Sequence, residues 1–141
     1  MTRALLDTDI LSEVLKSRDA NVARAGAEYL ARHGEFNVSV VSVMEIGYGL
    51  HRANRRTQLE AFESTLTATC NVLSFDESAA ILAGRIEADL ERRGTPISVP
   101  DVMIAATALV ARLPIVTGNV AHFDAVKKLG YELTIANWRT P

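Results

Sequence analysis

Hydrophobic positions along the chain follow two different periods. Short apolar runs alternate with longer segments in which apolar residues recur every three or four positions. The short runs predict β-strands at residues 3–6, 37–41, 71–75, 114–118 and 131–136. The longer segments predict helices at residues 10–16, 22–32, 42–53, 57–68, 76–94 and 100–112. Strands separated by helices of this length predict a doubly wound parallel α/β sheet with helices on both faces.

Particular residue types mark where several of these helices begin and end. Ser42 and Asp76 are good N-cap residues, because their side-chain oxygens can accept hydrogen bonds from free amides of the first turn. Gly94 stands at the usual stop position of a helix. Pro100 fits the first turn of the next helix, where its missing N–H costs no hydrogen bond.

The size and composition of the chain are those of one compact domain. It has 141 residues, 48% of them hydrophobic, and no internal repeat or long linker, so residues 1–141 are predicted to form a single domain. The net charge of −2 provides no basic stripe for binding nucleic acid directly. This charge still allows a nuclease, since bound cations can supply the positive charge that holds a phosphate substrate.

The cysteine content and the apolar runs indicate where the protein is located. Cys70 is the one cysteine, so it cannot form an internal disulfide, and we expect a buried thiol in a reducing cytoplasm. No apolar run is long enough to cross a membrane, and Asp7 and Asp9 interrupt the first one. We therefore expect a cytoplasmic protein without a membrane segment. Trp138 is expected to seal the core near the C-terminus.

Two carboxylates directly follow the first predicted strand. Asp7 stands at its carboxyl end, which is where functional crevices form in open parallel sheets. The structural alternative is that Asp7, Thr8 and Asp9 cap the first helix, where negative charge is favourable. A single cap explains one acid and not two, so we favour a functional role for Asp7 and give Asp9 less weight.

Glu45 and Asp101 lie near other strand ends or helix starts. Each has a structural alternative, because Ser42 and Glu45 have capping-box spacing and Asp101 lies in the first turn of its helix. A parallel α/β fold can bring both acids beside Asp7, where three carboxylates would repel one another in a medium of low dielectric constant. A bound Mg²⁺ or Mn²⁺ ion would remove this repulsion and could activate water for attack on a phosphodiester.

Two other protein classes place acids at strand ends. Haloacid-dehalogenase-like phosphatases begin with a similar Asp-x-Asp, but Leu11 stands where they usually have Thr or Val, and their later Lys and paired-Asp signatures have no convincing counterpart. Phosphorelay receiver domains need an Asp after the third strand and a Lys after the fifth, and neither is in place. Both classes fit less well than a metal-dependent hydrolase.

Four segments, in order, resemble the PIN-domain ribonucleases and, among them, the VapC-type toxins of toxin–antitoxin pairs. These are "LLDTDILS" with Asp7, "SVVSVMEIGYGL" with Glu45, "DVMIAATAL" with Asp101, and "IVTGNVAHF" followed by Trp138 near the end of the chain. The resemblance runs over almost the whole chain. It implies a PIN-like fold and a metal-dependent endoribonuclease that leaves a 5′-phosphate.

The resemblance also implies roles for individual residues and partners. Asp7, Glu45 and Asp101 would ligate Mg²⁺ or Mn²⁺, and Thr8 and Thr117 would support them through hydrogen bonds. The partners implied are an RNA substrate, a small VapB-type antitoxin that silences the enzyme, and a second copy of the chain in a homodimer.

The fourth segment departs from the pattern of this family. Many relatives have an Asp where Asn119 stands or an acid where His122 stands, and this chain has neither. Asn119 can orient a water or support a ligand, but it brings no negative charge to a second cation. Asp124 is a candidate replacement, although an ordinary exposed residue is the simpler interpretation. The alternative function is a catalytically silent PIN-like binding module, with a phosphatase a distant third.

Overall fold

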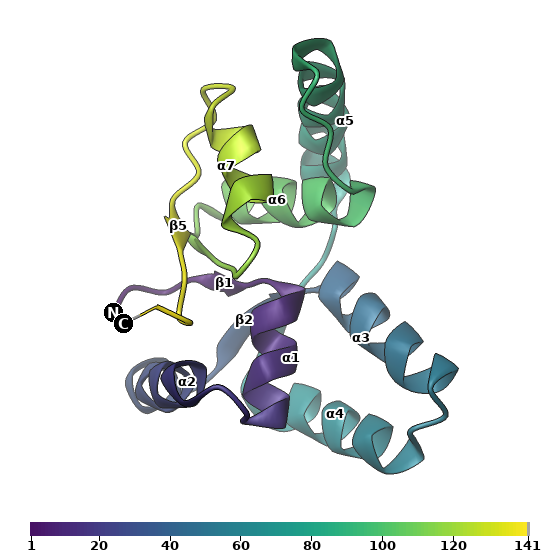
Figure 1. The fold of residues 1–141 in the computed structure, drawn as a ribbon, viewed down its shortest axis with the longest axis vertical. Helices are drawn as coiled ribbons and strands as arrows, with labels where there is room; N and C mark the ends of the chain where they lie inside the picture. Colours follow the sequence, from purple (N-terminus) through teal and green to yellow (C-terminus); the bar gives the residue numbers. More distant parts are fainter. Residues whose placement is uncertain (141) are drawn as a thin grey trace.

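The computed structural model describes residues 1–140 and has a parallel sheet at its centre (Figure 1). The strands lie in the order β3-β2-β1-β4-β5, and every neighbouring pair is parallel. Their bounds are β1 Leu5–Leu6, β2 Phe36–Ser39, β3 Cys70–Leu73, β4 Ile115–Val116 and β5 Ile135–Ala136. The chain runs outward from β1 to β3 on one side and returns to β4 on the other. This change of direction between β1 and β4 is where open α/β sheets form a crevice at their carboxyl edge.

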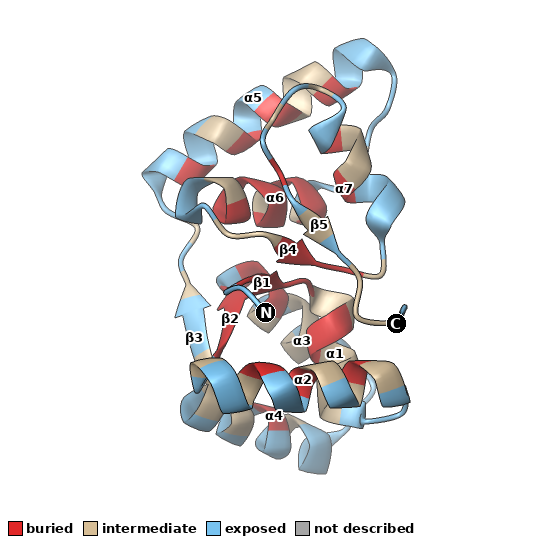
Figure 2. Cartoon of the chain, turned by 90° about the vertical axis from the view of Figure 1, so that its left-hand side faces the viewer, coloured by how far each residue is buried: buried red, intermediate tan, exposed pale blue. Residues whose placement is uncertain are grey.

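Helices cover both faces of this sheet, as the sequence predicts (Figure 2). The described residues form α1 Thr8–Lys16, α2 Ala20–His33, α3 Val40–Arg52, α4 Arg56–Thr69, α5 Glu77–Arg93, α6 Val99–Ala111 and α7 Val120–Lys127. Helices α5, α6 and α7 lie on one side of the sheet, and α1 to α4 lie on the other. None of the helices within residues 1–140 combines the length and apolar character needed to cross a membrane.

The alternation of side chains along the strands divides the core into two parts. Leu5 packs with the apolar side chains of α5, α6 and α7, whereas the next residue, Leu6, packs with those of α1 and α2. In the same way Ile115 belongs to the first core and Val116 to the second. Successive residues of a strand point to opposite faces, so even a strand of two residues contributes to both layers.

Several predicted boundaries are confirmed and others are wrong. Asp76 caps α5 by accepting a hydrogen bond from the Ala79 amide at 2.9 Å, and Gly94 ends that helix with φ of 74°. The prediction that Ser42 caps the third helix is wrong. Ser39 is the N-cap of α3, and its hydroxyl accepts from the Val41 amide at 3.0 Å. The second strand therefore ends two residues earlier than expected.

The outer and last elements also differ from the prediction. The final strand is confined to Ile135–Ala136 instead of beginning at residue 131, and α7 was not predicted at all. Helix α7 has only eight residues and no side-chain cap at its N-terminus, so the usual sequence signals are weak there. The first and fourth strands are shorter than predicted, and the third begins one residue and ends two residues earlier, at Cys70 and Leu73.

Two isolated predictions concern Cys70 and Trp138. Cys70 is only partly buried, and that burial raises the pKa of its thiol. Trp138 packs against the core on the α2 side, with its ring centroid 5.7 Å from that of Tyr29. The role of Trp138 in sealing the core is therefore confirmed, whereas Cys70 is less buried than predicted.

Candidate active site

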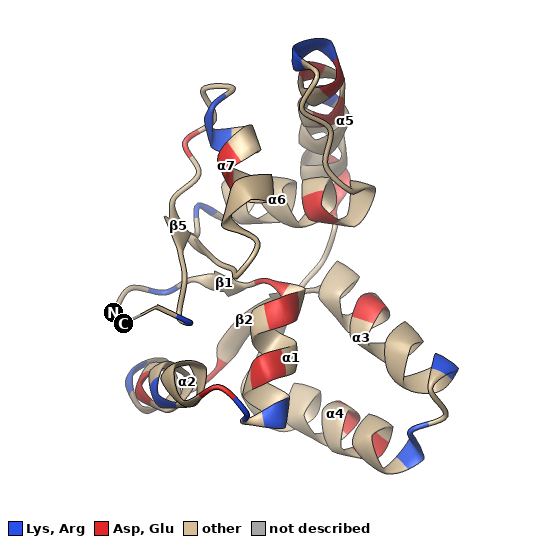
Figure 3. Ribbon diagram, viewed as in Figure 1, with Lys and Arg blue, Asp and Glu red and all other residues tan. Residues whose placement is uncertain are grey.

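The predicted site residues gather at the carboxyl edge of the sheet, around the end of β1. Asp7 directly follows β1 and Thr117 directly follows the neighbouring strand β4. Asp101 lies in the first turn of α6, and Glu45 lies in the second turn of α3. Figure 3 shows acidic residues at the end of β1 and along α1 and α3.

Asp7 is the most buried of these acids, with 2% of its surface exposed. Its Oδ1 accepts a hydrogen bond from the Thr8 amide at 2.8 Å, and its Oδ2 accepts one from the Thr117 hydroxyl at 2.8 Å. The Thr117 oxygen in turn accepts from the Asn119 amide at 2.9 Å. Asp7 is also the N-cap of α1, so the capping interpretation is confirmed, while its role as a metal ligand stays a prediction.

The electrostatic environment of Asp7 opposes its ionisation. Burial, helped by the charges of Asp9 and Asp101, raises the pKa of this carboxyl from 3.8 to about 7, although the hydrogen bonds from Thr117 and Thr8 lower it. The hydrogen bonds do not offset the burial and the neighbouring negative charges. A cation at this position would favour the ionised form, which is the property expected of a metal site.

Glu45 contacts α1 instead of capping its own helix. The Thr8 hydroxyl donates to Glu45 Oε1 at 2.7 Å and lies 2.8 Å from the Ser42 hydroxyl. Because a hydroxyl has one hydrogen, Ser42 is the donor in the second bond. The capping-box alternative for Ser42 and Glu45 is wrong, since the helix begins at Val40 and Ser42 lies inside it.

Asp101 lies at the start of α6, where Ser98 is the N-cap and Pro100 is in the first turn, as predicted. Its Oδ2 lies 2.7 Å from Nδ1 of His122, a residue of α7 whose side chain is about half exposed. In the sequence, His122 is visible only as a departure from the family pattern. Its contact with Asp101 joins residues 21 positions apart, and no sequence signal predicts such a pairing.

Asp9, which the sequence pattern favours less than Asp7, also contacts the segment after β4. Its Oδ2 accepts from the Gly118 amide at 2.9 Å, which links the first turn of α1 to the segment after β4. Its Oδ1 is buried and has no hydrogen-bond partner among the described residues. The sequence signal for Asp9 is the Asp-x-Asp spacing, because Asp7 and Asp9 both follow the central strand.

The side chains of Asn119 and Asp124 lie outside this group of contacts. Asn119 is exposed and stands at the N-terminus of α7, where its side chain makes no capping hydrogen bond. Asp124 pairs with Lys128 one turn later on the same helix, at 3.0 Å. The simpler interpretation of Asp124, as an ordinary surface acid, is therefore confirmed.

The donor set fits a hard divalent cation, although the side chains are not already arranged around one. Within residues 1–140, no three His, Cys, Asp or Glu side chains form a ready metal site. Glu45 accepts a hydrogen bond from Thr8, and Asp101 lies beside His122. The carboxylate oxygens are the ligand type that Mg²⁺ and Mn²⁺ prefer, and Asp9 Oδ1 remains without a partner.

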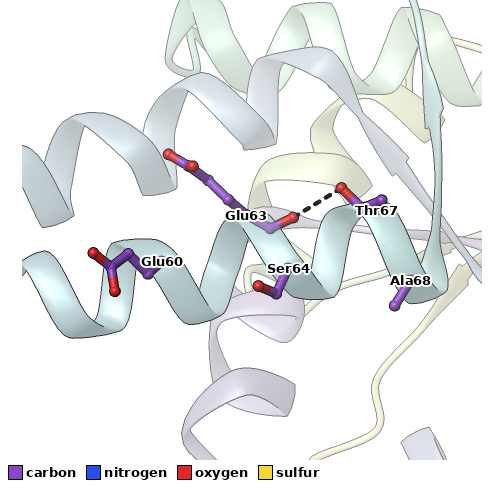
Figure 4. A pocket seen from close by; sticks show the side chains of 5 residues that line it. All are labelled: Glu60, Glu63, Ser64, Thr67 and Ala68. Atoms are coloured by element: carbon purple, nitrogen blue, oxygen red, sulfur yellow. Dashed lines mark hydrogen bonds between the residues drawn. The ribbon is translucent and has the colours of Figure 1, made fainter.

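Figure 4 shows a surface hollow elsewhere on the molecule. It is lined by residues of α4 alone, namely Glu60, Glu63, Ser64, Thr67 and Ala68. The Thr67 hydroxyl donates to the Glu63 carbonyl within this helix at 3.2 Å. None of the acids at the carboxyl edge of the sheet lines this hollow, so it is not part of the candidate site.

Comparison with known families identifies this arrangement. The sequence profile of the PIN domain matches residues 4–129, which include β1, α3, α6 and the fourth segment. The chain belongs to the PIN-domain family. The resemblance drawn from the four sequence segments is thus confirmed, and so is the α/β fold that it implies.

Individual relatives match this PIN domain along nearly its whole length. It is 32% identical to the tRNA(fMet)-specific endonuclease VapC of Shigella flexneri over 132 residues, which cover 94% of this chain and 98% of that protein. It is 28% identical to ribonuclease VapC2 of Haemophilus influenzae strain Rd over 138 residues, covering 98% and 99% of the two chains.

Solved structures agree with this assignment. A chain in the crystal structure of DNA-bound VapBC from Salmonella typhimurium superposes on this PIN domain with a TM-score of 0.82 at 27% identity, covering 98% of this chain and 99% of that one. A chain of VapBC-1 from nontypeable Haemophilus influenzae gives a TM-score of 0.80 at 25% identity, with coverage of 97% and 98%.

Proposed function

We propose that this PIN domain is the endoribonuclease toxin of a VapBC-type toxin–antitoxin pair and that it hydrolyses RNA with the help of Mg²⁺ or Mn²⁺. Relatives named VapC ribonuclease or endonuclease, aligned over nearly their full length, support the RNA-cleaving activity. The likeness to chains of VapBC complexes supports a VapB-type antitoxin as the partner. Membership of the PIN-domain family leaves no support for the phosphatase alternative.

One observation carries the metal dependence. Asp7 is buried, and this burial, together with the charges of Asp9 and Asp101, raises its pKa to about 7. A protein that only needed a helix cap would gain nothing from several mutually repelling acids. Asp7, Glu45 and Asp101 would hold the cation, which when bound polarises a phosphodiester and makes a water molecule more acidic.

The remaining residues of the site orient these acids. Thr117 and the Thr8 amide bind the two oxygens of Asp7 and fix its plane. The Thr8 hydroxyl holds Glu45 against α1. Hydrogen bonds of this kind fix the orientation of metal ligands, and losing one typically lowers metal affinity or activity by about 10–100-fold. Asn119 contributes a neutral amide at the edge of the site, where it can orient water.

The test is cleavage of total RNA by the purified protein with Mn²⁺ or with EDTA. We expect fragments with 5′-phosphate ends in Mn²⁺ and none in EDTA. Asp101→Asn should abolish cleavage. Asp124→Asn is the matched control, because it makes the same change on a carboxylate that pairs with Lys128. If the parent protein failed to cut RNA with either Mg²⁺ or Mn²⁺, the catalytically silent binding module would be the better function.

The partner and the assembly need separate measurements. Co-expression with a VapB-type antitoxin should give a complex that co-purifies and does not cleave RNA. Free protein that stays fully active in the presence of every such antitoxin would contradict this role. The homodimer and the cytoplasmic location stay predictions, and the mass of the free protein from light scattering tests the first of these.

A further inference from the structure

The candidate cation site has an acid that the sequence pattern does not supply. In the fourth segment Asn119 is exposed and carries no charge, and Asp124 is engaged with Lys128 on the surface of α7. Neither residue therefore provides a fourth carboxylate. Asp9 lies in the first turn of α1, and its side chain contacts this same segment at Gly118.

Asp9 is held at one oxygen and free at the other. Its Oδ2 accepts from the amide of Gly118, the residue directly before Asn119, at 2.9 Å. Its Oδ1 is buried and unpaired within the part of the chain that the structure describes. A buried carboxylate oxygen without a partner costs free energy, and this cost disappears when a ligand binds it.

Adjacent contacts place Asp9 beside the group of acids around Asp7. The Thr117 hydroxyl donates to Asp7 Oδ2 at 2.8 Å, and the amide of the next residue, Gly118, donates to Asp9 Oδ2 at 2.9 Å. Arg139 is the nearby cation, but its Nη1 lies 3.6 Å from Glu13 Oε1 and 3.5 Å from Asp19 Oδ2. The guanidinium is thus directed to acids farther along α1 and at the start of α2.

The backbone around Gly118 is adapted to this carboxylate. A Cβ atom at Gly118 would collide with Asp9 Oδ2, and it would come within 3.1 Å of Arg139 Nε. With glycine at this position, the carboxylate reaches the amide without a steric clash. The absence of a side chain at residue 118 and the position of Asp9 are therefore one structural feature.

We infer that Asp9 supplies the fourth carboxylate of the cation site, the one that Asn119 lacks, with Oδ2 fixed by the Gly118 amide and Oδ1 left as the ligand atom. The inference rests on the proposed function, because that function uses a cation. It assigns the fourth ligand to α1 instead of to the loop after β4. The Asp7-Thr8-Asp9 sequence then contributes two ligands from one helix start.

The experiment is calorimetric titration with Mn²⁺, combined with thermal unfolding in EDTA and in Mn²⁺. Asp9→Asn keeps an oxygen for the Gly118 amide and removes the charge, so the variant should fold. In EDTA its melting midpoint should equal or exceed that of the parent, since repulsion with Asp7 is relieved. Its affinity for Mn²⁺ should fall at least about tenfold, a loss that even indirect ligand contacts cause.

Two further variants complete the design. Gly118→Ala displaces the Asp9 carboxylate and should weaken Mn²⁺ binding in the same way, without changing any charge. Asp124→Asn is the control and should bind Mn²⁺ as the parent does. If Gly118→Ala fails to fold, Asp9→Asn alone decides.

The outcomes separate this inference from the proposed function. Unchanged Mn²⁺ affinity in Asp9→Asn, in a parent that binds Mn²⁺ and cleaves RNA, overturns the role of Asp9 and leaves the function intact. A parent that binds no Mn²⁺ overturns both the inference and the metal dependence. Lower affinity in Asp9→Asn and Gly118→Ala, with the control unchanged, establishes Asp9 as a ligand.

Discussion

The carboxylates at the two ends of α1 have pKa values shifted in opposite directions. At the C-terminal end, Glu13 accepts from the amides of Arg18 and Asp19 at 2.8 and 3.0 Å and faces Arg139. Those amides, and after them the Arg139 charge, hold the pKa of Glu13 below its usual range. At the N-terminal end, burial and the neighbouring acids raise the pKa of Asp7 to about 7.

This difference separates an acid that stabilises the fold from one that is available for chemistry. Both residues receive two hydrogen bonds, so the number of donors does not distinguish them. What differs is that Glu13 lies beside a cation, whereas Asp7 is buried among other acids. A fold stabilises its structural charges with its own residues, and a site that binds a cation leaves part of its charge uncompensated.

The largest expected effect comes from removing the charge at the N-terminal end. Asp7→Asn keeps the size of the side chain and should lower the rate of RNA cleavage by about 10³-fold or more, as for the loss of a principal electrostatic contact. Single-turnover cleavage in Mn²⁺ measures the rate, and circular dichroism confirms that the variant is folded. Cleavage at the rate of the parent would show that Asp7 is only a helix cap.

The second prediction concerns stability against pH in the metal-free protein. Asp7 has a folded-state pKa of about 7 against an ordinary value of 3.8, so its contribution is fully present below pH 3.8 and is lost as the pH rises through 7. In EDTA, Asp7→Asn should not lose stability in this pH range, because the asparagine side chain does not ionise. Its advantage over the parent in free energy of unfolding should grow between pH 4 and 8 to the order of a few kcal/mol.

Urea unfolding at a series of pH values measures this difference. The comparison of the two proteins at each pH cancels the contributions of the other titrating groups. A constant difference across the series would mean that Asp7 ionises normally in the folded protein.

The third prediction removes a hydrogen bond at the same end. Thr117→Val keeps the shape of the side chain but leaves Asp7 Oδ2 and the Asn119 amide without their partner. We expect a loss of about 1–3 kcal/mol in free energy of unfolding, together with slower cleavage. Denaturant unfolding measures the free energy of unfolding, and the cleavage assay measures the rate of RNA cleavage.

Thr107→Val is the matched control for this substitution. Thr107 is also buried, but its hydroxyl donates to the Met103 carbonyl inside α6, at 2.8 Å, and it does not contact an acid. It should affect stability less and leave cleavage unchanged. Equal losses of activity in the two variants would contradict a specific role for Thr117.

The smallest effect is expected at the C-terminal end of α1. Glu13 has a lowered pKa, so its contribution to stability is present above its ordinary value of 4.5 and is lost as the pH falls through the lowered value. Glu13→Gln should therefore lower the melting midpoint slightly at pH 7 and not in strong acid, which is the opposite sign to Asp7→Asn. Cleavage should be unchanged. Loss of RNA cleavage in Glu13→Gln would contradict a purely structural role for Glu13.

In open parallel sheets, functional residues collect at the carboxyl ends of strands and at helix starts, and this principle located the main acids from the sequence. Asp7 follows β1 and Asp101 lies in the first turn of α6, as predicted, and in a parallel sheet the helices that follow strands begin at the carboxyl edge. The same reasoning gave Asp9 less weight and did not find His122 as the partner of Asp101. Both depend on contacts between segments more than twenty positions apart in the chain.

The start of α3 shows why local signals were insufficient for Glu45. Ser39 and Ser42 are both suitable caps, and the Ser-x-x-Glu spacing favoured Ser42. In the folded protein β2 ends at Ser39, which leaves Ser42 inside the helix, where it is fully buried beside Thr8. Glu45 is then free to contact α1, and this contact exists only once the two helices are packed together.

The sequence by itself determined the fold class, the PIN-domain family and the acids at the ends of the central strands. Hydrophobic periodicity and short motifs depend on residues that are close in the chain, so they can be recognised from the sequence alone. Only the tertiary structure decided how the charges are partnered: Asp7 with Thr117, Asp101 with His122, and Asp9 with the Gly118 amide. The physical reason is that burial and electrostatic energy depend on distances between residues that the chain brings together only when it folds.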